Sequence, residues 1–136
     1  MYDHKIALAL RADLPDWQKL NVTAFLASAV AIQFPETHGQ PLVSASGSTF
    51  LPFLKHPILI YQAPDAAALH KALARGRERG VHVGIYTQEL FATNNEAENL
   101  AEIARYPDQE LNLVGIGLYG LNKEVDKALR GLKLHP

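Results

Sequence analysis

The sequence contains no cysteine, and this absence excludes several kinds of chemistry. Such a chain forms no disulfide, offers no thiolate to a zinc ion and has no cysteine nucleophile. The absence fits the reducing cytosol, where disulfides are rare, so we expect a cytoplasmic protein. Apolar runs are also short. None approaches the roughly 20 residues that a membrane-spanning helix needs, and we expect no membrane partner.

Net charge is small as well, at −1 from 13 basic and 14 acidic residues. Proteins that bind nucleic acid tightly carry a marked basic excess, so we do not expect tRNA as a partner. The six histidines show neither H-x-x-x-H nor H-E-x-x-H spacing. We therefore expect no metal site and no cofactor.

Apolar segments alternate along the 136 residues, 48% of which are hydrophobic, and this is enough for one globular domain spanning residues 1–136. Uninterrupted apolar runs at 6–10 and 113–118 predict the two central strands, buried on both faces. Further strands are predicted at 57–61 and 81–87, and helices at 17–34, 66–79, 96–105 and from 122 onward. This β-α-β-α-β-α-β-α order predicts an α/β protein with three layers, α/β/α, in which helices cover both sheet faces.

Several residues beside these segments are typical of structural roles. Asn95 and Asn122 are predicted to cap the helices that follow them, and Gly80 to end helix 66–79. Trp17, at the start of the first helix, is expected to pack as an anchor. The irregular stretch 35–57 is predicted to hold a short extended segment at 42–44.

Short motifs along most of the chain resemble peptidyl-tRNA hydrolase II. Residues 9–14 (Ala-Leu-Arg-Ala-Asp-Leu) resemble the exit of that family's first strand, and Lys19 falls at the lysine of its first helix. Its middle strand–helix–strand unit is resembled by residues 58–87. A later strand of the family is resembled by residues 113–117, its final helix by 125–127 and its tail by 132–134. The resemblance implies a four-stranded mixed sheet with one antiparallel strand and helices on both sides.

The chain departs from that family at the positions that carry its hydrolase activity. Thr23 stands where the family has glutamine, Leu26 stands where it has histidine, and residues 87–91 replace the segment with its catalytic aspartate. Helix 96–105 and the stretch SGSTFLPF at 46–53 have no counterpart in the small hydrolases. The resemblance therefore implies a separate branch of the superfamily, made of conserved proteins of unknown function, that lacks the hydrolase motif.

Lys19 is the one site residue that the resemblance carries over. Lys19 and Thr23 lie four residues apart near a helix start, where unpaired N–H groups attract anions. We expect a pocket for a small anionic or polar ligand at the carboxyl ends of the strands. Its predicted lining residues are Lys19, Thr23, Ser46, Ser48, Thr87 and Gln88. The alternatives are a solvated Lys19 and a serine loop whose hydroxyls bind their own backbone.

Asp13 and Glu89 are the acidic candidates for catalysis beside Lys19. Asp13 follows the first strand and could equally hold the turn there. Glu89 follows strand 81–87 and could act as an acid or base, or be a solvated loop residue. Neither assignment decides whether the protein is an enzyme.

Three functions remain open at this point. The first is binding of a small polar or anionic ligand without hydrolase activity. The second is an active hydrolase of peptidyl-tRNA or a related ester, with Lys19 and a replacement acid. The third is a homodimeric interaction module that uses apolar surface near Phe50–Leu54.

Overall fold

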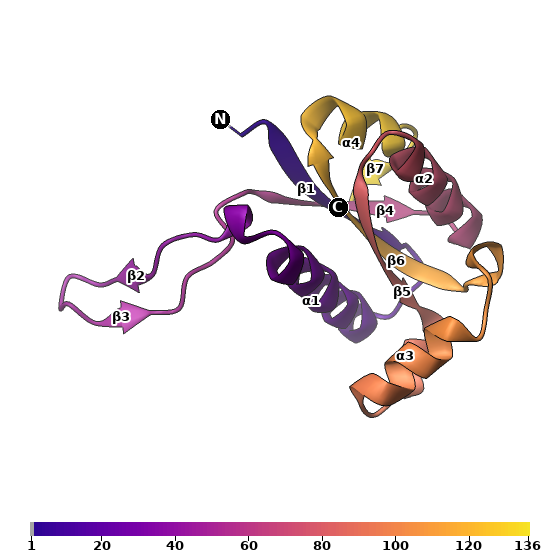
Figure 1. Ribbon diagram of the computed structural model, residues 1–136, viewed down its shortest axis with the longest axis horizontal. Coiled ribbons are helices and arrows are strands. Elements are labelled where there is room, and N and C mark those ends of the chain that lie inside the picture. Colours follow the sequence, from indigo (N-terminus) through magenta and orange to yellow (C-terminus); the bar gives the residue numbers. More distant parts are fainter. Residues whose placement is uncertain (1) are drawn as a thin grey trace.

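The computed structural model describes residues 2–136 (Figure 1). The main body contains β1 (His4–Arg11), α1 (Asp16–Gln33), β4 (Ile58–Ala63), α2 (Ala66–Glu78), β5 (His82–Thr87), α3 (Glu96–Ala104), β6 (Leu113–Leu121), α4 (Asn122–Ala128) and β7 (Lys133–Leu134). A hairpin of β2 (Leu42–Val43) and β3 (Thr49–Phe50) follows α1, and the 3-10 helices are η1 (Pro35–Thr37), η2 (Gln88–Ala92) and η3 (Asp108–Glu110). Among the described residues, no helix combines the length and apolar character needed to cross a membrane.

The main sheet has five strands in the order β5-β6-β1-β4-β7. β1 and β4 are parallel, whereas β6 is antiparallel to both of its neighbours and β7 is antiparallel to β4. The resemblance implied four strands with one of them antiparallel, and both numbers are wrong, because β7 adds a fifth strand and a second antiparallel one. A two-residue strand is too short to show any hydrophobic periodicity. The prediction that β1 and β6 are interior strands is confirmed, since they pair with each other and each has a second neighbour.

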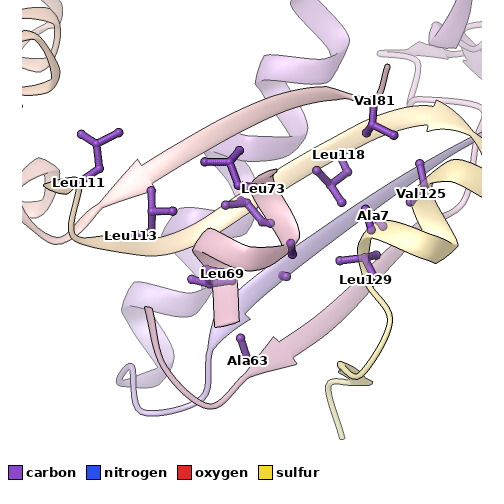
Figure 2. Close-up of a cluster of buried hydrophobic side chains, with 14 residues drawn as sticks. Ala7, Ala63, Leu69, Leu73, Val81, Leu111, Leu113, Leu118, Val125 and Leu129 are labelled. Carbon is purple, nitrogen blue, oxygen red and sulfur yellow. The ribbon is translucent and has the colours of Figure 1, made fainter. Parts of the chain in front are cut away.

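Helices lie on both faces of the sheet (Figure 1). On one face, Ile6, Leu8 and Leu10 of β1 pack in a cluster with the buried side of α1. On the other face, alternate residues of β1 pack beneath α2 and α4, in the cluster that Figure 2 shows around Leu69 and Val125. The continuous apolar run of β1 follows from this arrangement, because successive strand residues point to opposite faces and both faces are covered.

Three glycines form a glycine floor beneath α1, namely Gly84 on β5 and Gly115 and Gly117 on β6. A Cβ atom at Gly115 would lie 2.6 Å from Cγ1 of Val22, closer than packed atoms allow. At Gly117 and Gly84 the nearest atoms would be 3.4 Å and 3.7 Å away, and Leu26 is a neighbour at both. Glycines inside a strand often mark a close approach, and here α1 is what approaches.

The structure tests three predicted helix boundaries. Gly80 follows the last turn of α2 with φ +72°, the left-handed conformation that favours glycine. Asn95 caps α3, since its side chain accepts a hydrogen bond of 2.9 Å from the backbone N–H of Glu98. The prediction for Asn122 is wrong. This residue is the first of α4, and its side chain donates instead to the carbonyl of Tyr2, 2.8 Å away.

Residues 39–54 form a protruding arm that ends in the β2–β3 hairpin (Figure 1). Its base is held by backbone bonds from Gly39 to Phe53 and from Lys55 to Thr37, each 2.8 Å long. Its tip turns at Gly47, whose φ is +86°. The predicted extended segment at 42–44 corresponds to β2, and every side chain from 40 to 53 is exposed.

Candidate functional site

Lys19 and Thr23 line a cavity of about 450 Å³ between the start of α1, the strands β1 and β4, and the C-terminal residues. The Lys19 ammonium lies 3.1 Å from Nε2 of His135, whose backbone N–H is bound to the carbonyl of Ile60 at 2.9 Å. The Thr23 hydroxyl donates to the carbonyl of Lys19, 2.7 Å away. Two of the six predicted lining residues are thus neighbours, and His135 is a partner that the sequence did not indicate. We call this space the Lys19 cavity.

Thr87 and Gln88 do not line the Lys19 cavity. β6 separates β5 from β1, and the cavity lies on the opposite side of β1, next to β4. Thr87 is buried at 2% exposure, and it follows Tyr86, which belongs to the cluster under α1. Because alternate strand residues point to opposite faces, Thr87 is directed away from α1.

Ser46 and Ser48 lie at the tip of the arm, far from the body in Figure 1. The turn there is closed by backbone bonds, from Gly47 to Ser44 and from Ser44 to Ser48, each 3.0 Å long. The arm is anchored at its base and extends outward, so its serines do not fold over the edge of the sheet. The structure therefore does not bring the six predicted residues together.

Asp13 and Glu89 have separate surroundings. Arg11 binds both carboxylate oxygens of Asp13, at 2.9 Å and 3.1 Å. This pairing lowers the pKa of Asp13, so the carboxylate is a poor acceptor for a proton near neutral pH. Glu89 lies on η2 and faces α3, where it shares a cavity with Glu102 and Arg105, and its buried Oε2 has no hydrogen-bond partner among the described residues. Neither acid lines the Lys19 cavity.

A second cavity, of about 510 Å³, lies between α1, the end of β5 and the segment from η2 to α3. We call it the aromatic–amide pocket, because rings and carboxamides dominate its lining. Its aromatic residues are Trp17, Phe25, Tyr86 and Phe91, and its carboxamides are Asn21, Asn94, Asn95 and Asn99. Glu96 is its one charged lining residue among those that the structure describes.

The rings of this pocket contact one another edge to face or tilted. Centroids of Trp17 and Phe91 are 5.6 Å apart, those of Tyr86 and Phe91 5.1 Å, and those of Phe25 and Tyr86 5.8 Å. These separations are typical of favourable aromatic pairs. Trp17 is nevertheless 59% exposed and Phe25 54% exposed, so much of their ring surface remains uncovered.

The polar groups of the pocket are partly engaged. The Tyr86 hydroxyl donates to Oδ1 of Asn21 at 3.4 Å, and the hydroxyl of Thr93 donates to Oδ1 of Asn99. Among the described residues, no hydrogen bond involves the side-chain nitrogen of Asn21 or of Asn99. The side-chain carboxamide of Asn94 likewise has no partner among them. Burial raises the pKa of Tyr86, so its hydroxyl stays protonated and serves as a neutral donor.

Sequence reasoning assigned Trp17 to packing and Asn95 to capping, and it missed their shared pocket. Asn95 does cap α3, and Trp17 does contact Phe91, yet both also line the cavity. The available signal was the pair Asn94–Asn95, which follows an apolar strand and an aromatic residue within a few positions. Among the described residues, no group of three or more histidine or acidic side chains has the arrangement of a metal site.

One solved structure and one family model match this chain over nearly its whole length. A solved structure of a protein of unknown function from Agrobacterium tumefaciens strain C58 is 39% identical to this chain, with a TM-score of 0.95 and both chains fully covered. No curated protein matches the chain. The family model "Protein of unknown function (DUF2000)" matches residues 4–136. The sequence-based expectation of a family of unknown function is confirmed, and the link to peptidyl-tRNA hydrolase II stays a prediction. The chain belongs to the DUF2000 family.

Proposed function

We propose that this protein binds a small, planar, polar molecule in the aromatic–amide pocket and does not hydrolyse it. One observation carries the proposal, namely that four aromatic rings and four carboxamides surround a single cavity of about 510 Å³. Ligand pockets in proteins have volumes of roughly 300–1,000 Å³ and combine apolar walls with a few converging polar groups. The proposal includes a cytosolic location, which the absence of cysteine fits.

The chemistry of the lining favours an uncharged heteroaromatic ligand. The half-exposed rings of Trp17 and Phe25 offer surfaces on which a flat ring system can stack. The amide of Asn95 is bound by Glu98, but the nitrogens of Asn21 and Asn99 are available as donors. The carboxamide of Asn94 offers both a donor and an acceptor, which suits a ring nitrogen next to an exocyclic amino or carbonyl group. The described lining contains no lysine, arginine or histidine, so an anion would find no countercharge there.

The Lys19 cavity is a second candidate site, and it favours an anion. Lys19 has no carboxylate within ion-pair distance among the described residues, although Asp16 lines the same cavity. Its ammonium lies 3.1 Å from Nε2 of His135 and, being a donor only, can give this ring nitrogen a hydrogen bond. An anion that displaced this contact would gain a charge-assisted bond.

A hydrolase site with Lys19 and a replacement acid gains less support from the geometry. Asp13 is bound by Arg11, and Glu89 lies in a different cavity from Lys19. An acid or base must come within hydrogen-bond reach of the same substrate atoms as the group it assists. We therefore retain hydrolysis of peptidyl-tRNA or a related ester only as the alternative function.

Fluorescence of Trp17, the sole tryptophan, tests the first proposal. Titration with adenine, nicotinamide or benzamide should quench the emission in a saturable way. Asn21→Leu removes a polar contact of the pocket and should weaken that binding by roughly threefold to tenfold, the value of one hydrogen bond. Lys19→Ala is the matched control at the neighbouring cavity and should leave the titration unchanged.

The anion site has its own readout. Inorganic phosphate or sulfate should raise the thermal unfolding temperature of the wild type and not that of Lys19→Ala. Absence of saturable quenching by every ring compound, or equal affinity in Asn21→Leu, refutes the aromatic–amide proposal. An equal phosphate response in the wild type and Lys19→Ala refutes the anion site.

A further inference from the structure

The outward side of α1 is apolar, which is unusual for a surface helix. We call this side the outer stripe, and it lies opposite the buried side chains of Val22, Leu26 and Val30. Its residues are Leu20, Ala24, Ser28, Ala31 and Ile32. Leu20 is 72% exposed and Ile32 is 81% exposed. Large apolar side chains on the outward side of a helix gain nothing from water, so the outer stripe lacks a cover in the single chain.

The arm presents a second uncovered apolar surface. Its exposed large side chains are Leu42, Val43, Phe50, Leu51 and Phe53. Residues 39–54 contain no charged side chain, and the outer stripe contains none either. Figure 1 shows the arm leaving the body beyond the C-terminal end of α1 and pointing away from that helix. The arm therefore does not cover the outer stripe of its own chain.

The overall similarity to the solved relative indicates that the arm has a similar position there. If the 16 residues of the arm did not superpose on the relative, the other 120 of the 136 residues could give a TM-score of about 0.88 at most. The observed TM-score of 0.95 is higher than this limit. An isolated two-stranded hairpin is at best marginally stable in water. A hairpin with two-residue strands that holds the same position in two proteins requires a surface against which it packs.

We propose that two copies of this chain exchange arms, so that the arm of each copy packs on the outer stripe of the other. The two uncovered surfaces are both uncharged and belong to the same chain. A single two-fold axis therefore covers both at once, whereas a different partner would need a separate match for each. The occupant of the outer stripe is thus a second copy.

The exposed area is large enough for such a dimer. Seven large side chains on the two surfaces, each exposing on the order of 100 Å², give roughly 700 Å² per chain, close to the ~800 Å² per partner of a standard stable interface. This inference does not depend on the ligand proposed above.

Sedimentation equilibrium tests the oligomeric state. The wild type should be a dimer at micromolar concentration, and Leu51→Asp on the arm or Ile32→Asp on the stripe should each raise the dimer dissociation constant at least roughly tenfold. Both residues are exposed in the single chain, so the variants should keep the wild-type circular dichroism spectrum. Leu100→Asp, on the exposed side of α3 and 66% exposed, is the matched control and should remain dimeric.

Cysteine pairing tests the exchange itself, because the native chain has no cysteine. A mixture of Leu51→Cys chains and Ile32→Cys chains should form a disulfide-linked pair upon oxidation. A monomeric wild type, an open-ended series of larger oligomers, or a dimer unaffected by both aspartate substitutions would each overturn the proposal. A third sample is a chain that carries both substitutions, Leu51→Cys and Ile32→Cys. If the mixture forms no disulfide-linked pair and this double variant forms its disulfide within one chain, the exchange is also refuted.

Discussion

The substitution Gly115→Ala tests whether α1 rests directly on the sheet. The added Cβ would lie 2.6 Å from Cγ1 of Val22 and 3.2 Å from methyl carbons of Leu10 and Leu26. All three neighbours are buried, so none can move away freely. Inserting a methyl group into a well-packed core costs about 1–3 kcal/mol. Replacing glycine by alanine also stabilises the folded state by about 0.4–1 kcal/mol, because the unfolded chain loses conformational freedom.

The net effect should be a loss of about 1–2 kcal/mol in the free energy of unfolding. Gly84→Ala is the matched control, because Gly84 also lies beneath α1 but has more space. Its added Cβ would be 3.7 Å from the nearest atoms, which belong to Ala29 and Leu26. Neither Gly84 nor Gly115 has a positive φ, so alanine meets no backbone strain at either position. The control should therefore be neutral or more stable than the wild type by up to about 1 kcal/mol.

Urea unfolding at a fixed protein concentration measures both variants, provided that the slope against urea stays constant. Gly115→Ala should also cost less in a Val22→Ala background, because the closest clashing atom is gone. Equal unfolding midpoints for Gly115→Ala and Gly84→Ala, or an unchanged cost in the Val22→Ala background, would refute the close contact between α1 and β6.

Further predictions concern pH, a helix cap and catalysis. Burial lowers the pKa of His56 below its usual 6.5, so the folded state binds fewer protons than the unfolded state. The free energy of unfolding should therefore fall as pH drops through about 6.5. Urea unfolding at several pH values should show that His56→Gln flattens this dependence. Asp65→Ala removes the cap of α2, a hydrogen bond of 2.9 Å, and should cost about 1 kcal/mol, whereas Asp108→Ala, which breaks an exposed ion pair, should cost less than about half of that. The purified protein should not release tRNA from peptidyl-tRNA, and turnover that Lys19→Ala abolishes would contradict this.

Local patterns in the sequence were sufficient for the main elements. The helix predicted at 66–79 is α2 at 66–78, and the strand predicted at 81–87 is β5 at 82–87. Such elements bury one stripe or two faces, and the periodicity of their apolar residues records that burial. β7 left no such record, because its two residues are exposed and are held by backbone pairing to β4.

The candidate site could be predicted only in part, because pocket geometry depends on strand order. Lys19 and Thr23 were placed together correctly, since they lie on one helix. Thr87 was expected beside them because β1 and β5 run in the same direction, but β6 lies between the two strands. Asn21 and Phe25 share α1 with Trp17, but the other lining residues of the aromatic–amide pocket lie between 85 and 99, about 70–80 residues later in the chain. No local pattern connects these two segments.

The pairing of β1 with β6 also constrains the order of folding. His4 pairs with Leu121 and Leu10 pairs with Gly115, so the central ladder joins residues more than 100 positions apart. Contacts of this length slow folding, because a long loop must close before they form. A ribosome that adds about 5–20 residues per second produces β6 some 5–20 seconds after β1. During that interval one edge of β1, whose residues 6–10 are all apolar and buried in the folded protein, has no partner, and it is there that a chaperone would first be needed.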